Sequence, residues 1–405
     1  MKGRKPVSQE GGDGGSGREA ADELFFVLLV PALNEEQVIA KTLTSLLGLT
    51  GNFLILVVDD ASDDGTVAAI TPFLADERVR LLARPREEAR TGKGDALNAG
   101  FAEARRLVHE LGLAERYGAQ NIVVVVFDSD GRVDPDFLRA VAPAFQDPRT
   151  AGVQSAVRMY NAGQNVLTSW QHLEFVVWGE IFLRAKDILG SATLGGNGQC
   201  VRLTALAGLG DAPWRPSLTE DLDLSLRLLI QGWRLRFCPS VAVWQEAVPS
   251  FRKLVRQRSR WLQGHVVSWN ALPHLLRSRL PVHARLDLLV FLLLPAFFLP
   301  IGLASLGSWR AFWLGTGQWQ VFDLLGSYLL GFALAPLTLW AWHRTEHPRV
   351  PRLLVYGHLF VLYAYVWLLA SAEAGWNILL GRRSWAKTSR VSGQGLPQPA
   401  GIVRA

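Results

Sequence analysis

Short apolar runs alternate with helical patterns over residues 24–248. Each run consists of apolar or β-branched residues bounded by turn-forming or charged residues, which is typical of buried strands. After the first run, Asn34 and Gln37 form a capping-box pattern that predicts the start of a helix. Strands that alternate with helices predict an α/β fold with a mostly parallel, doubly wound sheet. The expected strands are residues 24–30, 54–58, 79–83, 122–127 and 152–158.

The pattern changes at about residue 249, after which long apolar segments dominate. Each segment has about 20 residues, the length of helix that crosses a bilayer. Core helices of a soluble protein are the alternative, but such helices seldom run this long without a polar face. We therefore expect a membrane-embedded α-helical region at residues 286–380. Its segments are expected near residues 286–306, 321–342 and 353–372.

The amino-acid composition excludes several classes of protein. The chain has 405 residues, of which 49% are hydrophobic and 19% charged, and this excludes a disordered or fibrous chain. Cys200 and Cys238 are too few for a disulfide framework and lack metal-ligand spacing. Residues 1–23 are Gly-rich and polar, so we expect a disordered tail there. The apolar run that follows is short and ends in a proline, which argues against a signal peptide.

Positive charge is concentrated beside the expected membrane segments. The formal net charge is +6, and residues 251–285 hold eight Lys and Arg residues but no Asp or Glu. This predicts a basic interfacial region at residues 249–285 that faces anionic lipid headgroups. A second basic tail is expected at residues 381–405, and the α/β domain at residues 24–248.

Acidic residues follow two of the expected strands. Asp59 and Asp60 end the second strand, and Asp128 and Asp130 follow the fourth. A single Asp after a strand is usually a turn former or a helix cap. Because ligands collect at the carboxyl ends of parallel strands, two such clusters in one sheet favour a metal–diphosphate site. Mg²⁺ or Mn²⁺ bound in this way completes its shell with water and substrate phosphates.

Two glycine-rich turns could approach a ligand. Lys93 lies between glycines in TGKGDALNAG, just before an expected helix, where it can pair with a phosphate or diphosphate. Gly94 stands where a Walker A loop has Ser or Thr, so that motif is excluded. A flexible surface turn is the alternative. The GGNGQCVR turn at residues 195–202 is compatible with a ligand contact or with an ordinary loop.

The segment that begins SLTEDLDL at residue 217 predicts another helix. Ser217 and Glu220 match a capping box, and acidic residues in a first turn can be purely structural. Because a metal site is expected in the same domain, one of Glu220, Asp221 and Asp223 is also a candidate base that deprotonates a hydroxyl.

The motif QRSRW at residues 257–261 lies in the basic stretch and has two interpretations. Arginines and a tryptophan before a membrane segment can serve only as an interfacial anchor. Alternatively, the arginines stabilise a leaving diphosphate and the tryptophan stacks on a sugar or a base.

Taken in order, these motifs resemble a known family. PALNEE, VVDDASDDGT, GKGDALN, FDSD, TED and QRSRW look like those of the membrane-bound family 2 glycosyltransferases, which include cellulose, chitin and hyaluronan synthases and many bacterial relatives. The resemblance runs from about residue 24 to residue 261. The combination is specific, although each motif alone is not. GRRSWAKTSR at residues 381–390 also looks like the Trp-x-Lys-Thr tail of bacterial members.

The resemblance implies a GT-A fold and an inverting transfer from a nucleotide-diphosphate sugar, with a UDP-sugar expected. In such a family, Asp60 would contact the nucleotide, and Asp128 with Asp130 would hold the divalent metal and the diphosphate. Asp221 matches the general base that activates the acceptor hydroxyl. The acceptor channel and donor pocket would be lined by Gln257, Arg260 and Trp261.

The expected topology contains a conflict. The catalytic domain is expected at the cytoplasmic face of the cell (inner) membrane, where nucleotide sugars are found. Three crossings would then place the basic C-terminal tail outside, against the positive-inside rule. The first segment is the suspected re-entrant or interfacial one, because Pro295 and Pro300 interrupt it.

The first expectation for the product is an exopolysaccharide, and a single transfer to a lipid is the close alternative. QRSRW favours processive extension of an exopolysaccharide-type product, although the motif also fits a single transfer to a lipid. The short membrane region supports the single transfer, because a hydrophilic polymer needs a polar-lined path. A catalytically inactive binding module and a transporter are further alternatives. No nucleic-acid partner is expected.

Overall fold

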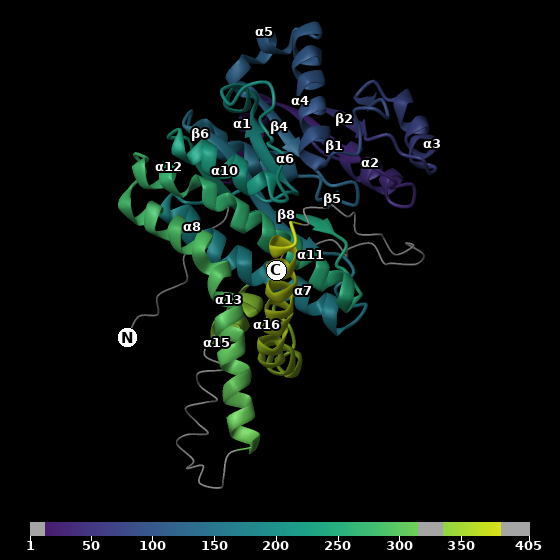
Figure 1. Cartoon of the computed structure of the whole chain (residues 1–405). Coiled ribbons are helices and arrows are strands. Elements are labelled where there is room, and N and C mark those ends of the chain that lie inside the picture. Colours follow the sequence, from purple (N-terminus) through teal and green to yellow (C-terminus); the bar gives the residue numbers. More distant parts are fainter. Residues whose placement is uncertain (1–12, 315–334, 382–405) are drawn as a thin grey trace, which may run out of the picture.

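The structure, a computed structural model, describes residues 13–314 and 335–381, and its centre is a mixed eight-stranded sheet (Figure 1). The strand order is β3-β2-β1-β4-β7-β6-β8-β5. Strand β1 (Phe25–Ala32) pairs in parallel with β2 (Phe53–Asp59) and β4 (Ile122–Val126), and β2 pairs in parallel with β3 (Val79–Ala83). The other half of the sheet contains β5 (Arg132–Val133), β6 (Thr150–Met159), β7 (Gln199–Arg202) and β8 (Arg234–Gln245).

Helices cover both faces of this sheet, so the central strands are buried on both sides. Every residue of β2 and β4 is buried. Val27 and Leu29 of β1 join one apolar cluster, while Leu28 and Val30 join the cluster on the other face. The helical segments before residue 250 are α1 (Asp13–Asp22), α2 (Ile39–Leu47), α3 (Thr66–Ile70), η1 (Thr71–Ala75), α4 (Lys93–Glu110), α5 (Leu113–Tyr117), η2 (Ala119–Asn121), α6 (Phe137–Val141), η3 (Ala142–Gln146), α7 (Val166–Val177), η4 (Trp178–Leu183), α8 (Arg184–Leu189), α9 (Leu203–Ala207) and α10 (Glu220–Ile230).

The five strands expected from apolar runs are confirmed as β1, β2, β3, β4 and β6. The sequence analysis missed β5, β7 and β8. These strands belong to the mixed half, where β7 runs antiparallel to both β4 and β6, and β5 runs antiparallel to β8. Short strands such as β5 and β7 owe their pairing to partners distant in sequence, and a local pattern does not reveal such partners.

Two expected helix caps are wrong. Helix α2 begins at Ile39 after Val38, and Asn34 has a positive φ of 53° and bonds to the loop after β2 instead. Thr219 precedes α10 without a side-chain cap, and the Ser217 hydroxyl accepts from the Thr219 amide. In both cases a contact outside the helix competes for the capping group.

The N-terminal tail is ordered in part. Residues 13–22 form α1, so the expected disorder is wrong for them, while residues 1–12 lie outside the described part of the chain. Ala20 and Ala21 are buried in the same cluster as Leu138 and Phe145. Burial of these small apolar side chains stabilises a segment that is otherwise glycine-rich.

All secondary-structure elements in the described part of the C-terminal region are helices. The region comprises α11 (Phe251–Val267), η5 (Ser268–Ala271), α12 (Leu272–Arg277), α13 (Val282–Leu314), α15 (Ala335–Glu346) and α16 (Val350–Leu379). Val282–Ala304 and Val350–Leu379 are long and apolar enough to cross a membrane, by length and composition alone. Most of the expected middle segment, residues 321–334, and the tail from residue 382 lie outside the described residues.

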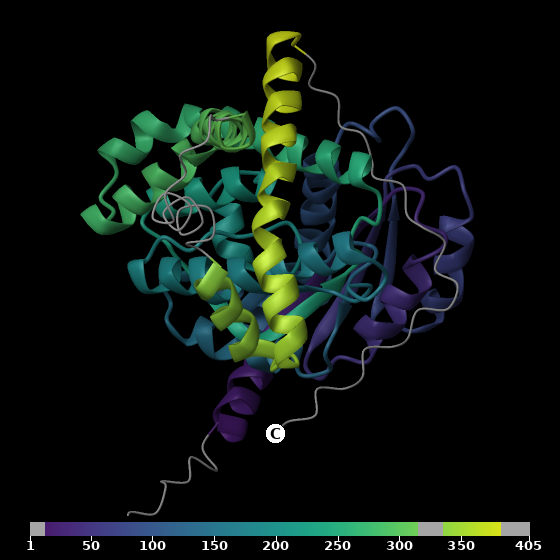
Figure 2. The same ribbon diagram turned by 90° about the horizontal axis from the view of Figure 1, so that it is seen from below.

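Helix α13 continues through both of its prolines, so the expected interruption is wrong. In the turn before Pro295, Trp269 Nε1 donates to the Leu292 carbonyl at 2.7 Å. This bond lies near the proline, but it does not replace the one that Pro295 lacks, because a helical N–H at residue 295 would donate to the Phe291 carbonyl. The two candidate membrane helices point in different directions: α13 leads away from the catalytic domain in Figure 1, whereas α16 runs across its underside in Figure 2.

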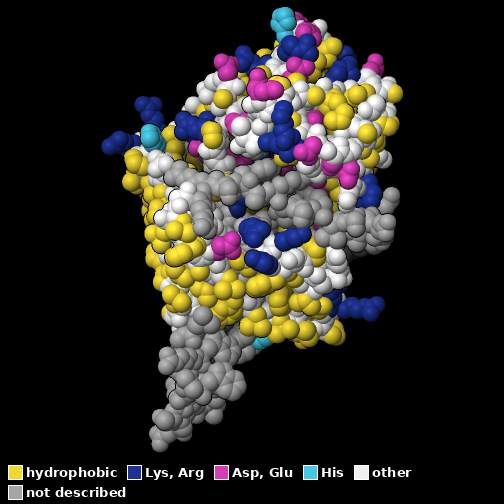
Figure 3. All heavy atoms as spheres, turned by 45° about the vertical axis from the view of Figure 1, so that its right-hand side comes forward, with side chains coloured by type: hydrophobic (Ala, Val, Ile, Leu, Met, Phe, Trp, Pro, Cys, Tyr) yellow, Lys and Arg dark blue, Asp and Glu magenta, His cyan; other side chains and the backbone are white. Residues whose placement is uncertain are grey.

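Charged and apolar side chains occupy different parts of the surface. Charged groups gather over the upper part of the molecule in Figure 3, and hydrophobic groups dominate the lower part, where α13 and α16 lie. Helix α16 buries Tyr363, Val366 and Ala370 against Leu254 and Leu262 of α11. Its exposed apolar residues include Leu354, Val355, Leu359, Leu362, Leu369 and Trp376.

Candidate functional site

One large cavity, of about 2000 Å³, is lined by the candidate site residues that were predicted from the sequence. It opens at the carboxyl ends of β1, β2 and β4, and continues towards the C-terminal helices. The parallel pairing of these three neighbouring strands brings the two acidic clusters to one edge of the sheet. All eight selected residues line the cavity: Asp60, Lys93, Asp128, Asp130, Asp221, Gln257, Arg260 and Trp261.

Asp60 directly follows β2 and is 5% exposed. Its Oδ1 forms an ion pair with Arg84, and its Oδ2 accepts from the Arg90 amide at 3.0 Å. The carboxylate therefore ties the loop that follows β3 to the end of β2. This gives Asp60 a structural role beside the cavity in addition to any contact with a ligand.

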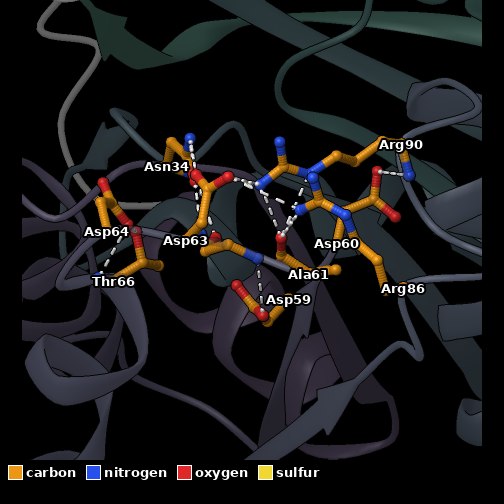
Figure 4. A network of polar contacts seen from close by, with 10 residues as sticks. Asn34, Asp59, Asp60, Ala61, Asp63, Asp64, Thr66, Arg86 and Arg90 are labelled. Atoms are coloured by element: carbon orange, nitrogen blue, oxygen red, sulfur yellow. Dashed lines mark hydrogen bonds and ion pairs between the residues drawn. The ribbon is translucent and has the colours of Figure 1, made fainter.

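The loop after β2 is held by a network around Asp63 (Figure 4). Asn34 Nδ2 donates to Asp63 Oδ1 at 2.7 Å, and Arg90 pairs with Asp63 Oδ2 at 2.7 Å. Arg90 also donates to the Ala61 carbonyl at 2.8 Å. Asn34, Ala61 and Arg90 all have positive φ angles, which non-glycine residues seldom adopt. The side-chain bonds thus hold three strained turns at the edge of the cavity.

Asp128 and Asp130 lie on one turn after β4, and Lys93 forms an ion pair with Asp128. Lys93 Nζ donates to Asp128 Oδ1 at 2.6 Å and to the Gly196 carbonyl at 3.0 Å. Burial lowers the pKa of Lys93, but the nearby carboxylates, with Asp128 first, outweigh it and raise the pKa overall. Lys93 is therefore a permanent positive charge in the cavity.

The acidic pair fits a divalent cation that takes most of its ligands from a substrate. Within residues 13–314 and 335–381, no group of three or more His, Cys, Asp or Glu side chains forms a complete metal cage. Asp128 is 30% exposed at its side chain, and the Lys93 ammonium already stands as a positive charge against its Oδ1. Asp130 is 4% exposed and its Oδ2 accepts from the Glu246 amide at 3.1 Å. Two carboxylates that line one cavity suit Mg²⁺ or Mn²⁺ completed by phosphate oxygens and water.

Asp221 lies in the first turn of α10, half-buried in the cavity wall. Burial, and then the like charge of Glu220, raise the pKa of Asp221 to about 7, against the lowering effect of Lys93. A carboxylate with such a pKa is suited to accept a proton near neutral pH. Asp223, another candidate of this turn, instead pairs with Arg227 at 2.8 Å.

The glycine-rich turn at residues 195–202, left open by the sequence, lies against the acidic pair. Asn197 Oδ1 accepts from the Asp128 amide at 3.1 Å, and its Nδ2 donates to Gln245 Oε1 at 3.0 Å. Gly198 has a φ of +74°, and a Cβ there would meet Ser155 Oγ at 2.3 Å. The turn therefore requires glycine so that its backbone can approach the site closely.

Helix α11 carries the QRSRW side chains, and the sequence analysis missed the role of Arg258 among them. Arg258 is 1% exposed and pairs with Glu174 of α7 at 2.5 Å. Its guanidinium also donates to Gln257 Oε1 at 2.8 Å. Glu174 further accepts from Tyr363 and Trp367 of α16, at 3.0 and 2.8 Å. A buried arginine thus joins the motif to two other helices, whereas the sequence had suggested for it, as for Arg260, a contact with a leaving diphosphate.

The far part of the cavity has mainly apolar walls. They come from α13, α16 and η4, a π-helical segment between α7 and α8. Such segments are rare and are frequent at functional sites. Trp178 of η4 stacks on Phe182 and contacts Phe291 of α13. The cavity is therefore polar at the strand ends and apolar among the C-terminal helices.

Comparisons with known proteins agree with this architecture. The family described as "Glycosyltransferase like family 2" matches residues 23–264. The beta-monoglucosyldiacylglycerol synthase of Nostoc sp. (strain PCC 7120) is 30% identical over 322 residues, covering 75% of this chain and 64% of the relative. A probable glycosyltransferase of Bacillus subtilis is 28% identical over 258 residues, covering 61% of this chain and 57% of the relative. The chain thus spans less than two thirds of the length of these curated relatives.

Among solved structures, the mannosyltransferase PcManGT from Pyrobaculum calidifontis, in complex with GDP-Man and Mn²⁺, has a similar fold. Its TM-score is 0.57 at 20% sequence identity, and the match covers 87% of each chain. The expected GT-A fold is confirmed by this likeness and by the family match.

Proposed function

Because the chain belongs to the glycosyltransferase family 2, we propose that it transfers a sugar from a nucleotide-diphosphate sugar to an acceptor hydroxyl, with inversion at the anomeric carbon. The observation that supports this most directly is the cavity itself. One space joins an acidic pair, a permanent cation, a carboxylate with a raised pKa and the QRSRW helix. A UDP-sugar is the donor to be tested first.

The donor binds at the strand ends in this proposal. Asp128 and Asp130 would hold Mg²⁺ or Mn²⁺, which would supply positive charge to offset the charge that develops on the leaving diphosphate. Lys93 and Arg260 add positive charge to the same region. Asp60 holds the loop that receives the nucleotide.

Asp221 acts as the base in this proposal. It takes the proton of the acceptor hydroxyl while that oxygen attacks the anomeric carbon from the side opposite the diphosphate. One such displacement inverts the configuration. Gln257 and Trp261 line the space where the acceptor lies.

We further propose a lipid acceptor that receives one sugar. The apolar walls beyond Trp261 suit acyl chains, whereas a growing polysaccharide needs a polar-lined path. The Nostoc relative is named for a product built on diacylglycerol, which supports the same choice. Product size separates this proposal from the processive alternative.

Membrane association supports access to such an acceptor. Two helices are apolar enough to span a bilayer, and Arg252, Arg256, Arg277 and Arg279 are exposed on the basic stretch before them. We propose a multi-pass protein of the inner membrane with its catalytic domain on the cytoplasmic side. Because α16 packs on the underside of the domain, α16 is a better candidate for an interfacial helix than α13.

Purified enzyme in detergent micelles tests these proposals. A panel of UDP- and GDP-sugars is offered with diacylglycerol or with oligosaccharides, with Mg²⁺ or Mn²⁺ present or after chelation. The expected result is metal-dependent release of nucleoside diphosphate and a single glycolipid. A ladder of longer products would contradict the single transfer, and the absence of turnover with every donor and acceptor would contradict the enzyme activity.

A further inference from the structure

A buried polar cluster interrupts the apolar part of the cavity. Lys186 of α8 is 3% exposed, and its Nζ lies 2.5 Å from Asp287 Oδ2 of α13. Ser191 Oγ donates to the same Asp287 oxygen at 2.6 Å. Lys186 and Asp287 both line the cavity. An ionisable residue at the start of a candidate membrane helix, with its partner on the catalytic domain, is a functional-site candidate.

The ammonium of Lys186 has hydrogen-bonding capacity to spare. It carries three N–H donors, and Asp287 is the one hydrogen-bond acceptor that the described residues supply to it. Its charge also faces the Phe291 ring, 4.3 Å from the centroid. Burial lowers the pKa of Lys186, which a hydrogen bond to a further acceptor would offset. The site therefore favours a ligand that brings an acceptor oxygen.

The charge balance of the cluster favours a neutral ligand. The charges of Lys186 and Asp287 cancel one another. The nearby ring of His265 contacts that of Phe291, with 4.9 Å between the ring centroids. Burial lowers the pKa of His265 to about 4, so this ring adds no positive charge at neutral pH. A lipid phosphate would need an excess of cations here. A neutral carbonyl oxygen needs no excess positive charge, because one N–H donor of Lys186 is enough to bind it.

The cluster lies where the middle of a lipid acceptor would pass. His265 stands one helical turn after Trp261, and Phe291 connects His265 to Lys186 by direct contacts. Beyond them, Leu294, Phe298 and Ile301 continue the apolar wall along α13. A lipid with its hydroxyl near Asp221 would thus meet Lys186 before its chains reach that wall.

We propose that Lys186, held by Asp287 and Ser191, donates a hydrogen bond to an acyl-ester carbonyl of the lipid acceptor. This inference rests on the proposed transfer to a lipid. It assigns the enzyme a preference for ester-linked acyl lipids over their ether-linked analogues, because an ether lipid of equal length lacks the carbonyl. A hydrogen bond from a charged donor supports a preference of roughly tenfold in kcat/KM.

Competition between diacylglycerol and its dialkyl ether analogue in mixed micelles tests the proposal. The wild type should favour the ester about tenfold, as one charged hydrogen bond predicts. The double variant Lys186→Met with Asp287→Asn removes both charges together, which avoids an unpaired buried carboxylate. Its ester-to-ether ratio should fall towards one. Because both lipids compete in one tube, the ratio does not depend on the folded fraction of the variant.

Ile188→Ala on the same helix is the matched control. Ile188 is 85% exposed, so the ester preference should stay. Equal use of ester and ether by the wild type, or an unchanged ratio in the double variant, would overturn the carbonyl contact alone. Transfer to soluble saccharides and to neither lipid would overturn the lipid acceptor, and this contact with it.

Discussion

The guanidinium carbon of Arg258 lies 3.9 Å from the centroid of the Trp261 ring, three residues further along α11. Arg258 is fixed in turn by Glu174, which also accepts hydrogen bonds from α16. The orientation of a cavity-lining tryptophan therefore depends on a buried ion pair. It also depends on the packing of an apolar helix against the catalytic domain.

Arg258→Lys should impair use of the acceptor more than use of the donor. Lysine keeps the charge but loses the planar guanidinium that covers Trp261, at a cost of about 1–2 kcal/mol, or roughly five- to thirty-fold in kcat/KM for the acceptor. Steady-state kinetics with each substrate varied in turn measure the loss of kcat/KM for the acceptor and for the donor separately. Arg256→Lys, on an exposed face of α11, is the control. Equal losses for donor and acceptor would indicate a purely structural role.

Asp221→Asn should keep donor binding and lose transfer. The amide cannot take a proton, and removal of a general base costs roughly 10²- to 10⁴-fold. Donor affinity by calorimetry and turnover by nucleoside diphosphate release are the two measurements. Asp223→Asn, which breaks the pair with Arg227, should keep most of the activity. Near wild-type turnover of Asp221→Asn would end the assignment.

The pH profile should rise through neutrality. Asp221 acts as a base only when ionised, and its pKa is raised to about 7. Below that value kcat/KM should therefore fall about tenfold per pH unit, and above it kcat/KM should level off. Glu220→Gln removes a like charge that raises this pKa, so its profile should shift to lower pH. The range from about pH 5 to about pH 8 extends roughly two units below this pKa and one unit above it. A kcat/KM that stays constant over that range would contradict the assignment.

Asp128→Asn should raise the metal concentration needed for half-maximal activity. One of two carboxylates is lost from a site that also depends on substrate phosphates, so we expect a shift of roughly tenfold or more. Titration of Mn²⁺ and Mg²⁺ at fixed donor measures it. Asp136→Asn, in the exposed pair with Arg139, should leave the titration unchanged. Activity that survives thorough chelation in the wild type would argue against a metal.

Gly264→Ala should misplace the start of α10. A Cβ at residue 264 would lie 2.5 Å from the Thr219 side chain, two residues before Asp221. Overpacking of this kind costs about 1–3 kcal/mol of stability, and a small displacement of a base can cost about a hundredfold in rate. Thermal unfolding and kcat are measured together. Gly163→Ala, with no atom within 4 Å of its Cβ, should change neither.

Local patterns in the chain determined much of the architecture. Five mainly apolar runs became the strands β1, β2, β3, β4 and β6. The runs are continuous in β2 and β4, which are buried at every position, because strands buried on both faces need apolar residues throughout. The acidic residues after β2 and β4 could also be identified as one site from the sequence. Strands of a parallel sheet end at the same edge, so the residues that follow them lie close together.

Tertiary structure decided what lies around those residues. Arg258, Glu174 and Tyr363 come from three helices, and Lys186 and Asp287 lie 101 positions apart in sequence. A local sequence pattern does not predict such pairs. A charged side chain can be buried only when a partner from a distant part of the chain lies beside it. Pro295 illustrates the same limit. The proline predicted an interruption from the local sequence, yet α13 continues through it to Leu314.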